Sequence, residues 1–313
     1  MTNAAIFSFI VKTYALGAFG YFLFRFIISP AHLKWISFLF INILIPCMIL
    51  NTFLQKFSLD LLRSYSVIPF FSVLFIGLSL TAGIFIGKML GIAFRKEFIA
   101  MLSFTNSGYI VLPMILEFFR GPELDNAMIV NFLYTMLFML LMWSLGVYLM
   151  TDGKVKFSLK SVPLPFLITV ISIILGILGV KKYVPGQVFR GLKFIGTMGI
   201  YGAMVVLGGI LSQIRSTKEH RRDITAFLIL KNIALPLVFL FFIHMFSGDP
   251  LISICLSLAL ITPPANNLAI IFERYCPEHD ARKFVYPAMI ASYLLAMITM
   301  PMFFILLKYF SCR

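Results

Sequence analysis

Long runs of apolar residues, separated by short polar segments, recur along the whole chain. A helix that crosses a bilayer needs about 20 such residues. The runs therefore predict an all-α integral membrane protein with about ten membrane-spanning helices. We place these spans at residues 5–26, 34–54, 66–90, 97–119, 125–149, 163–180, 190–213, 224–246, 251–273 and 284–307.

Two of the predicted spans are interrupted in the middle. One contains Asn106-Ser-Gly-Tyr-Ile-Val-Leu-Pro113, and the other contains Thr262-Pro-Pro-Ala-Asn-Asn267. Non-helical backbone at bilayer depth leaves N–H and C=O groups unpaired, unless they line a cavity or bind something. Broken helices at matching places in two halves of a membrane protein indicate the substrate site of a transporter.

The two breaks lie in the fourth and the ninth span, which is the fourth span of each group of five. Because five is odd, the second group enters the membrane from the opposite side, so the two groups would be inverted repeats. We expect residues 1–150 and 151–313 to be these repeats, with the two broken helices crossing. The support for a repeat is positional, since the two sequences do not match closely.

Composition agrees with the pattern of spans. The chain is 61% hydrophobic and 12% charged, whereas soluble domains carry about 25% charged residues. The net charge of +14 comes from basic residues in short loops, which indicates orientation and contact with anionic membrane lipid rather than nucleic-acid binding. Loops after the odd-numbered spans hold more Lys and Arg than the other loops, and loops rich in Lys and Arg face the cytoplasm. This predicts that both termini lie on the extracellular side of the cell membrane.

Little in the sequence points to an enzyme. The four His are dispersed, the four Cys are expected to be free thiols, and no phosphate loop or nucleophile with a base is present. We therefore expect no enzymatic activity, no cofactor and no metal site.

The polar residues of the two breaks are the candidate substrate-binding residues. The free N–H groups and positive dipole ends of half-helix N-termini favour an anion, and amide side chains can donate to carboxylate oxygens. A pair of proline-kinked helices, with the amides bonded to neighbouring helices, would explain the same residues without a substrate. The candidates are Asn106, Ser107, Pro113, Thr262, Pro263, Pro264, Asn266 and Asn267.

Three further residues inside predicted spans are candidates for the same site. Asn42 and Asn131 could contact substrate or could bond a neighbouring helix. Lys231 could attract an anion, although for both Lys231 and Lys12 we favour a side chain that extends to the membrane interface.

No Asp or Glu lies beside either break. Glu97, Glu117 and Glu273 are expected near the ends of spans, where water or headgroups reach them. This argues against a proton relay through a buried carboxylate, whereas sodium remains compatible with amide and backbone oxygens.

The ordered set of motifs resembles the auxin efflux carrier family, which includes plant PIN-type carriers and prokaryotic malonate and malate permeases. The first break is similar to the family's Asn-Thr-Gly-Phe-x-Gly-x-Pro, with Val111 in place of the second glycine. Pro263-Pro-Ala-Asn-Asn267 is similar to Pro-x-Ala-x-Asn. Pro46 and Trp143-Ser-Leu-Gly-Val147 match the second span and the close of the fifth, while the proline common in the family's seventh span is missing.

The resemblance implies ten helices in two inverted five-helix repeats. Helices 1, 2, 6 and 7 would form a scaffold, often with a homodimer surface, and helices 3–5 and 8–10 would form the transport domain. The implied function is a secondary carrier of a small organic anion, such as a carboxylate, that works by elevator-type alternating access. The alternatives are a sodium-coupled bile-acid-type symporter or a cation/proton antiporter on the same architecture, or a non-transporting membrane sensor. The identity of the anion, the coupling ion (sodium or proton) and the direction of transport stay open.

Overall fold

The computed structural model describes residues 3–151, 153, 162–213, 219–246, 248–275 and 280–311. Within these residues the chain is helical, and extended backbone pairs at a single antiparallel bridge between Thr105 and Pro264. Seven helical stretches are long and apolar enough to cross a membrane, which confirms an α-helical membrane protein. They are Ala4–Ile27, Trp35–Lys56, Leu59–Met89, Gly121–Met150, Gly186–Gln213, Arg221–Met245 and Arg282–Lys308.

These seven stretches correspond to seven of the ten predicted spans. The span predicted at 163–180 is a shorter apolar helix, α10 (Leu164–Ile177). The two interrupted spans are each split into a pair of short helices, which confirms both interruptions. The pairs are α6 (Arg95–Ser103) with α7 (Val111–Phe118), and α14 (Pro250–Leu260) with α15 (Asn267–Tyr275). The inverted relation between the two halves of the chain stays a prediction.

The described chain divides into two compact units, each with segments from both halves of the sequence. Unit 1 takes its residues from Met1–Phe70, Leu112–Leu140 and Val162–Gln213. Unit 2 takes its residues from Phe71–Val111, Leu141–Ser161 and Ile214–Arg313. Both broken segments of backbone, at 104–110 and at 261–266, belong to unit 2.

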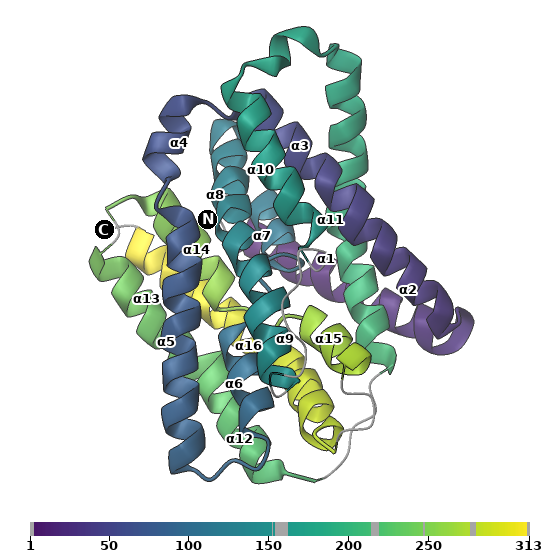
Figure 1. Ribbon diagram of the computed structural model, residues 1–313, viewed down its shortest axis with the longest axis vertical. Helices are drawn as coiled ribbons and strands as arrows, with labels where there is room; N and C mark the ends of the chain where they lie inside the picture. The colour runs from purple at the N-terminus through teal and green to yellow at the C-terminus, as the bar shows by residue number, and fades with distance from the viewer. Residues whose placement is uncertain are drawn as a thin grey trace. The chain divides into compact units, whose positions relative to one another are not determined.

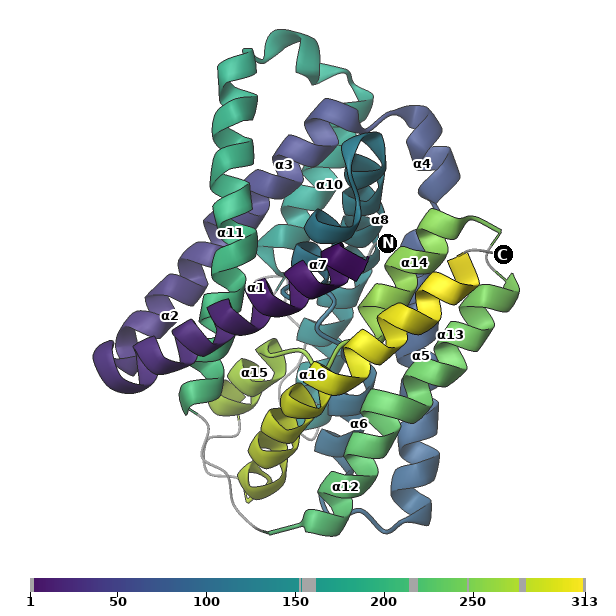
Figure 2. The same ribbon diagram turned by 180° about the vertical axis from the view of Figure 1, so that it is seen from behind.

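Unit 1 is built around the long helix α11 (Gly186–Gln213), which packs along both α1 (Asn3–Phe22) and α3 (Ile45–Lys56) (Figures 1 and 2). Glycines permit the closest crossing, because a Cβ added at Gly20 or Gly208 would collide with backbone atoms of Val205 or Gly17. The other elements of unit 1 are η1 (Leu23–Ile27), α2 (Pro30–Leu39), η2 (Phe40–Leu44), α4 (Leu59–Tyr65), nearly all of α7 and α8 (Gly121–Leu141), α10, and η5 (Val180–Tyr183).

In unit 2, α16 (Arg282–Ser311) packs against α6, α12 (Arg221–Ile229) and α14. Figure 2 shows α12 and α13 (Leu235–Phe246) running beside α16. Phe98, Phe227 and Phe284 join three of these helices, with ring centroids 6.1–6.3 Å apart, within the range of favourable aromatic pairs. The unit also contains α5 (Ile68–Met89) from Phe71 on, η3 (Met142–Gly146), α9 (Val147–Met150), η6 (Leu230–Ala234) and α15.

Two prolines inside spans are each preceded by a wide π turn. Pro46 follows η2, and Pro236 follows η6. Proline has no N–H and clashes with the carbonyl four residues earlier, and one extra residue in the turn relieves both problems. The turn of η6 carries Lys231 and Asn232, both of which are buried.

Candidate functional site

The two breaks pair with each other inside unit 2. The backbone N–H of Asn106 donates to the carbonyl of Pro263 at 2.8 Å, and the N–H of Ala265 donates to the carbonyl of Phe104 at 2.9 Å. Pro263 and Pro264 have no N–H to donate to the carbonyls of Ala259 and Leu260 four residues earlier, so α14 cannot continue through them. Buried backbone outside a helix must find other partners, and each break supplies them to the other.

Tyr293 of α16 holds both breaks together. Its hydroxyl donates to the carbonyl of Pro264 at 2.8 Å and accepts from Nδ2 of Asn106 at 2.7 Å. Oδ1 of Asn106 accepts from the backbone N–H of Tyr109 at 3.2 Å. The Asn106 side chain therefore fixes the shape of the first break. Sequence reasoning missed Tyr293, because a tyrosine in a long apolar helix gives no signal of such a role.

Lys231 closes the end of α6. Its side chain is only 2% exposed, and Nζ donates to the carbonyl of Leu102, in the last turn of α6, at 2.9 Å. The last carbonyls of a helix lack partners and carry partial negative charge, which an ammonium group compensates. The expectation that Lys231 extends to the membrane interface is wrong, because its ammonium group is buried in unit 2 and donates to the C-terminal end of α6.

Several buried polar side-chain atoms at the breaks have no hydrogen-bond partner among the described residues. We call their residues the break cluster. Hydroxyl and amide groups of this kind can donate to a carboxylate, accept from a hydroxyl or coordinate a cation through oxygen. The atoms are Thr105 Oγ1, Ser107 Oγ, Tyr109 OH, Oδ1 and Nδ2 of Asn266, and Oδ1 of Asn267.

Other predicted site residues have local structural roles. The Thr262 hydroxyl donates to the carbonyl of Ala259 at 2.8 Å and so closes the last turn of α14. Pro113 is the third residue of α7, where a missing N–H costs no helical hydrogen bond. In unit 2 the structure thus brings together seven of the eight break candidates, since Pro113 belongs to unit 1.

Asn42 and Asn131 also belong to unit 1. Asn42 lies in η2, and its Nδ2 donates to the carbonyl of Phe38 at 2.9 Å. Asn131 lies in α8 and is buried, and neither atom of its amide has a partner among the described residues.

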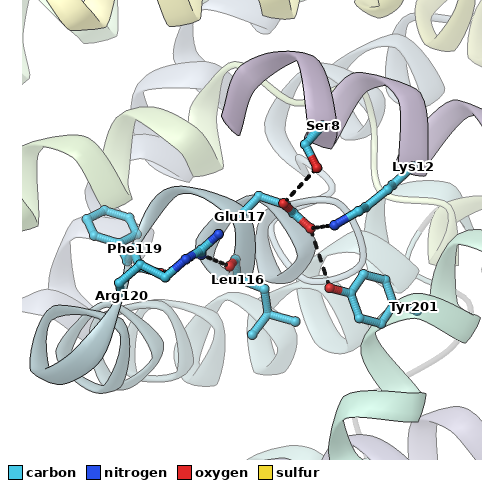
Figure 3. Close-up of polar contacts among 7 residues, drawn as sticks. All are labelled: Ser8, Lys12, Leu116, Glu117, Phe119, Arg120 and Tyr201. Atoms are coloured by element: carbon cyan, nitrogen blue, oxygen red, sulfur yellow. Dashed lines mark hydrogen bonds and ion pairs between the residues drawn. The ribbon is translucent and has the colours of Figure 1, made fainter. Parts of the chain in front are cut away.

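A second buried polar group, which we call the Glu117 cluster, lies in unit 1 (Figure 3). Oε1 of Glu117 is 2.6 Å from Nζ of Lys12, and Oε2 accepts from the Ser8 hydroxyl at 3.0 Å. The Tyr201 hydroxyl of α11 lies 3.5 Å from Oε1. To the left of Glu117 in Figure 3, Arg120 donates to the carbonyls of Leu116 and Phe119 and so closes the end of α7.

The expectation that water or headgroups reach Glu117 is wrong. Its side chain is 6% exposed, because residues of α1 and α11 surround it. Glu97 is buried as well. The side chain of Lys12 is half exposed, and its ammonium pairs with Glu117, a partner that sequence reasoning missed.

Metal-binding side chains do not gather in the described part of the chain. No group of three His, Cys, Asp or Glu residues there could hold an ion. Cys47 and Cys255 are free thiols, as predicted, whereas Cys276 and Cys312 lie outside the described residues.

The helices and their interruptions define a multi-pass membrane protein. The family model for membrane transport proteins matches residues 154–304, a range that includes the second break and Lys231. The match indicates a membrane transporter, and it supports the family resemblance at this coarse level. A comparison with curated proteins gives no match to the chain.

Proposed function

We propose that the protein is a secondary carrier of a small organic anion of the carboxylate class, with its substrate bound at the paired breaks. The observation that carries this proposal is the break cluster, in which buried hydroxyl and amide groups lack partners. Each unpaired buried polar group costs about 1–3 kcal/mol, so a substrate that bonds them recovers that free energy. Ser107, Asn266 and Asn267 would bond the substrate, while Asn106, Thr262, Pro263 and Pro264 would shape the site.

Charge favours an anion. Helix α15 begins at Asn267, directly after the second break. The free N–H groups at such helix starts attract negative charge. Neither break contains an Asp or Glu that would repel a carboxylate, and the ammonium of Lys231 is bonded to the helix that leads into the first break.

Burial of the site favours alternating access. Asn106, Ser107, Thr262 and Asn266 are at most 2% exposed, so a substrate can reach them only after a conformational change. The bonds through Tyr293 and between the breaks would make both breaks move as one body, as elevator-type transport requires. We propose the plasma membrane as the location, with both termini on the extracellular side. We also propose a homodimer that forms through the scaffold spans at residues 5–26, 34–54, 163–180 and 190–213.

A sodium-coupled symporter on the same architecture is the second candidate. The unpartnered oxygens of Thr105, Asn266 and Asn267 are the kind of ligand that hard cations bind. For an uncoupled anion, the inside-negative potential is worth about 2.3 kcal/mol per charge per 100 mV and drives efflux. Accumulation against that potential requires a coupled cation, either sodium or a proton.

Uptake into proteoliposomes tests the proposal. We would measure a panel of mono- and dicarboxylates with imposed voltage, sodium and pH gradients. We expect saturable, voltage-sensitive transport of at least one carboxylate, which is lost in Asn267→Ala. Thr225→Ala, an exposed polar-to-alanine change on α12, is the matched control and should transport normally. Indifference to voltage and to every carboxylate would overturn the anion proposal, and strict sodium dependence would select the symporter.

A further inference from the structure

The most unusual charge in unit 2 is the ammonium of Lys231. It lies in an apolar span, Arg221–Met245, and is almost completely buried. Ionisable residues inside a membrane are rare, normally pair with one another or with backbone carbonyls, and mark substrate and ion pathways. No ion pair among the described residues involves Lys231. Its one described hydrogen bond goes to the carbonyl of Leu102, although an ammonium group has three donors.

The position of this ammonium connects it to the paired breaks. Leu102 is the next-to-last residue of α6, and the first break starts at Phe104, whose carbonyl accepts from Ala265. Thr105 is three residues beyond Leu102, which is at most about 11 Å of extended chain. The charge therefore lies at the entrance of the segment that carries the unpartnered Thr105 and Ser107 hydroxyls.

A helix cap alone does not account for this charge. The end of a helix carries about half of an elementary negative charge, so a full ammonium leaves about half a positive charge uncompensated. The buried acidic residues of the same two helices, Asp223 and Glu97, lie more than one helical turn along the chain from Lys231 and Leu102, respectively. Asp223 lies eight residues earlier on the same span, about 12 Å along the helix, and accepts from the N–H of Ala93. Glu97 lies five residues before Leu102, about 7.5 Å along α6.

We infer that Lys231 is the charge-selecting residue of the carrier, and that it requires a carboxylate group on the substrate because its buried ammonium is paired in full only when the anion is bound. The inference rests on the proposed function and extends it, since it predicts that a neutral molecule of the same shape binds more weakly than the carboxylate. The break cluster supplies hydrogen bonds to either kind of molecule, whereas Lys231 distinguishes them by charge.

The test uses three variants of the full-length protein. Lys231→Gln keeps an N–H donor for the Leu102 carbonyl but removes the charge, and Lys231→Arg keeps the charge. Lys283→Gln removes a half-exposed charge of the same unit that pairs with Glu219, and it controls for long-range electrostatic effects. Thermal unfolding in detergent establishes that each variant is folded.

Binding is measured with malonate and phenylacetate, and with the neutral malonamide and phenylacetamide. We expect Lys231→Gln to bind the carboxylates about 10- to 100-fold more weakly, the range expected for a lost charge-assisted hydrogen bond. Its affinity for the amides should change less than about threefold, and Lys231→Arg and Lys283→Gln should retain most carboxylate affinity.

Three other results would overturn the inference. Unchanged carboxylate binding in Lys231→Gln would overturn the inference while leaving the proposed function intact. Equal losses in Lys231→Gln and Lys231→Arg would also overturn it, because shape and not charge would then matter. If the wild-type protein binds neither carboxylate, the proposed function fails for these probes, and the inference fails with it.

Discussion

The two buried polar clusters differ in whether their groups are paired. In the Glu117 cluster of unit 1, both carboxylate oxygens have partners, and those partners come from α1 and α11. In the break cluster of unit 2, five residues keep buried polar atoms without a partner among the described residues. Paired groups stabilise a fold, whereas unpaired groups retain the capacity to bind something else. The comparison assigns stability to the first cluster and ligand binding to the second.

The largest loss of stability is expected in the Glu117 cluster, where every carboxylate oxygen has a partner. Lys12 is half exposed but Glu117 is buried, so Lys12→Met leaves a buried carboxylate without its cation, which costs about 3 kcal/mol. Reversible unfolding in detergent measures the loss. The double variant Lys12→Met, Glu117→Gln should recover part of it, because no unpaired charge remains. Carboxylate affinity of the folded protein should stay within about twofold, and a selective loss of binding would contradict the comparison.

The next largest loss of stability is expected at Tyr293, which links the two breaks. Tyr293→Phe removes the hydroxyl that bonds Asn106 and Pro264, and leaves two buried groups unpaired. We expect unfolding to become easier by about 2 kcal/mol, together with weaker carboxylate binding. Tyr148→Phe, a change at an exposed tyrosine in unit 2, should alter neither property. Unaltered binding in Tyr293→Phe would show that the pairing of the breaks does not shape the site.

Asn106→Ala removes the other partner of the Tyr293 bond. The Asn106 amide is bonded to Tyr293 and to the N–H of Tyr109, so its loss should cost about 1–2 kcal/mol of stability. We expect a folded protein with little carboxylate binding. Unfolding curves and ligand titration, made side by side, measure the two effects. Normal uptake by this variant would remove Asn106 from the site.

The smallest change in stability should follow removal of an unpartnered amide. Asn266→Ala deletes two buried polar atoms that have no described partner, so the free energy of unfolding should be unchanged or rise by up to about 1 kcal/mol. Carboxylate affinity should nevertheless fall about tenfold. The control is Asn42→Ala, whose amide bonds only its own helix among the contacts described. If Asn266→Ala instead destabilises the protein strongly, the amide serves packing and not ligand binding.

Much of the fold could be predicted because its signals are local. Apolar length marks the spans, and seven stretches agree with the structure. The prolines and glycines near Asn106 and Pro263 break their helices wherever the rest of the chain lies, because proline lacks an N–H. Even the shortened span at α10 appears in the sequence as a short apolar run.

The partners of the polar side chains could not be predicted in this way. Lys231 and Lys12 have the same sequence signal, an isolated lysine in an apolar span, yet one closes α6 and the other pairs with Glu117. Tyr293 reaches Asn106 across 187 residues of chain, and Lys12 reaches Glu117 across 105. No local pattern encodes such pairs.

A helical membrane protein with two interrupted spans can be predicted from this sequence, because hydrophobic length and helix breaking depend on neighbouring residues alone. Which polar atoms have hydrogen-bond partners and which are left available depends instead on how the helices pack. A buried hydrogen bond depends on a few tenths of an ångström between atoms far apart in the chain, and packing alone sets that distance. For this reason the sequence located the breaks, and the fold distinguished the residues that hold them, such as Asn106 and Tyr293, from those that stay free to bind, such as Asn266.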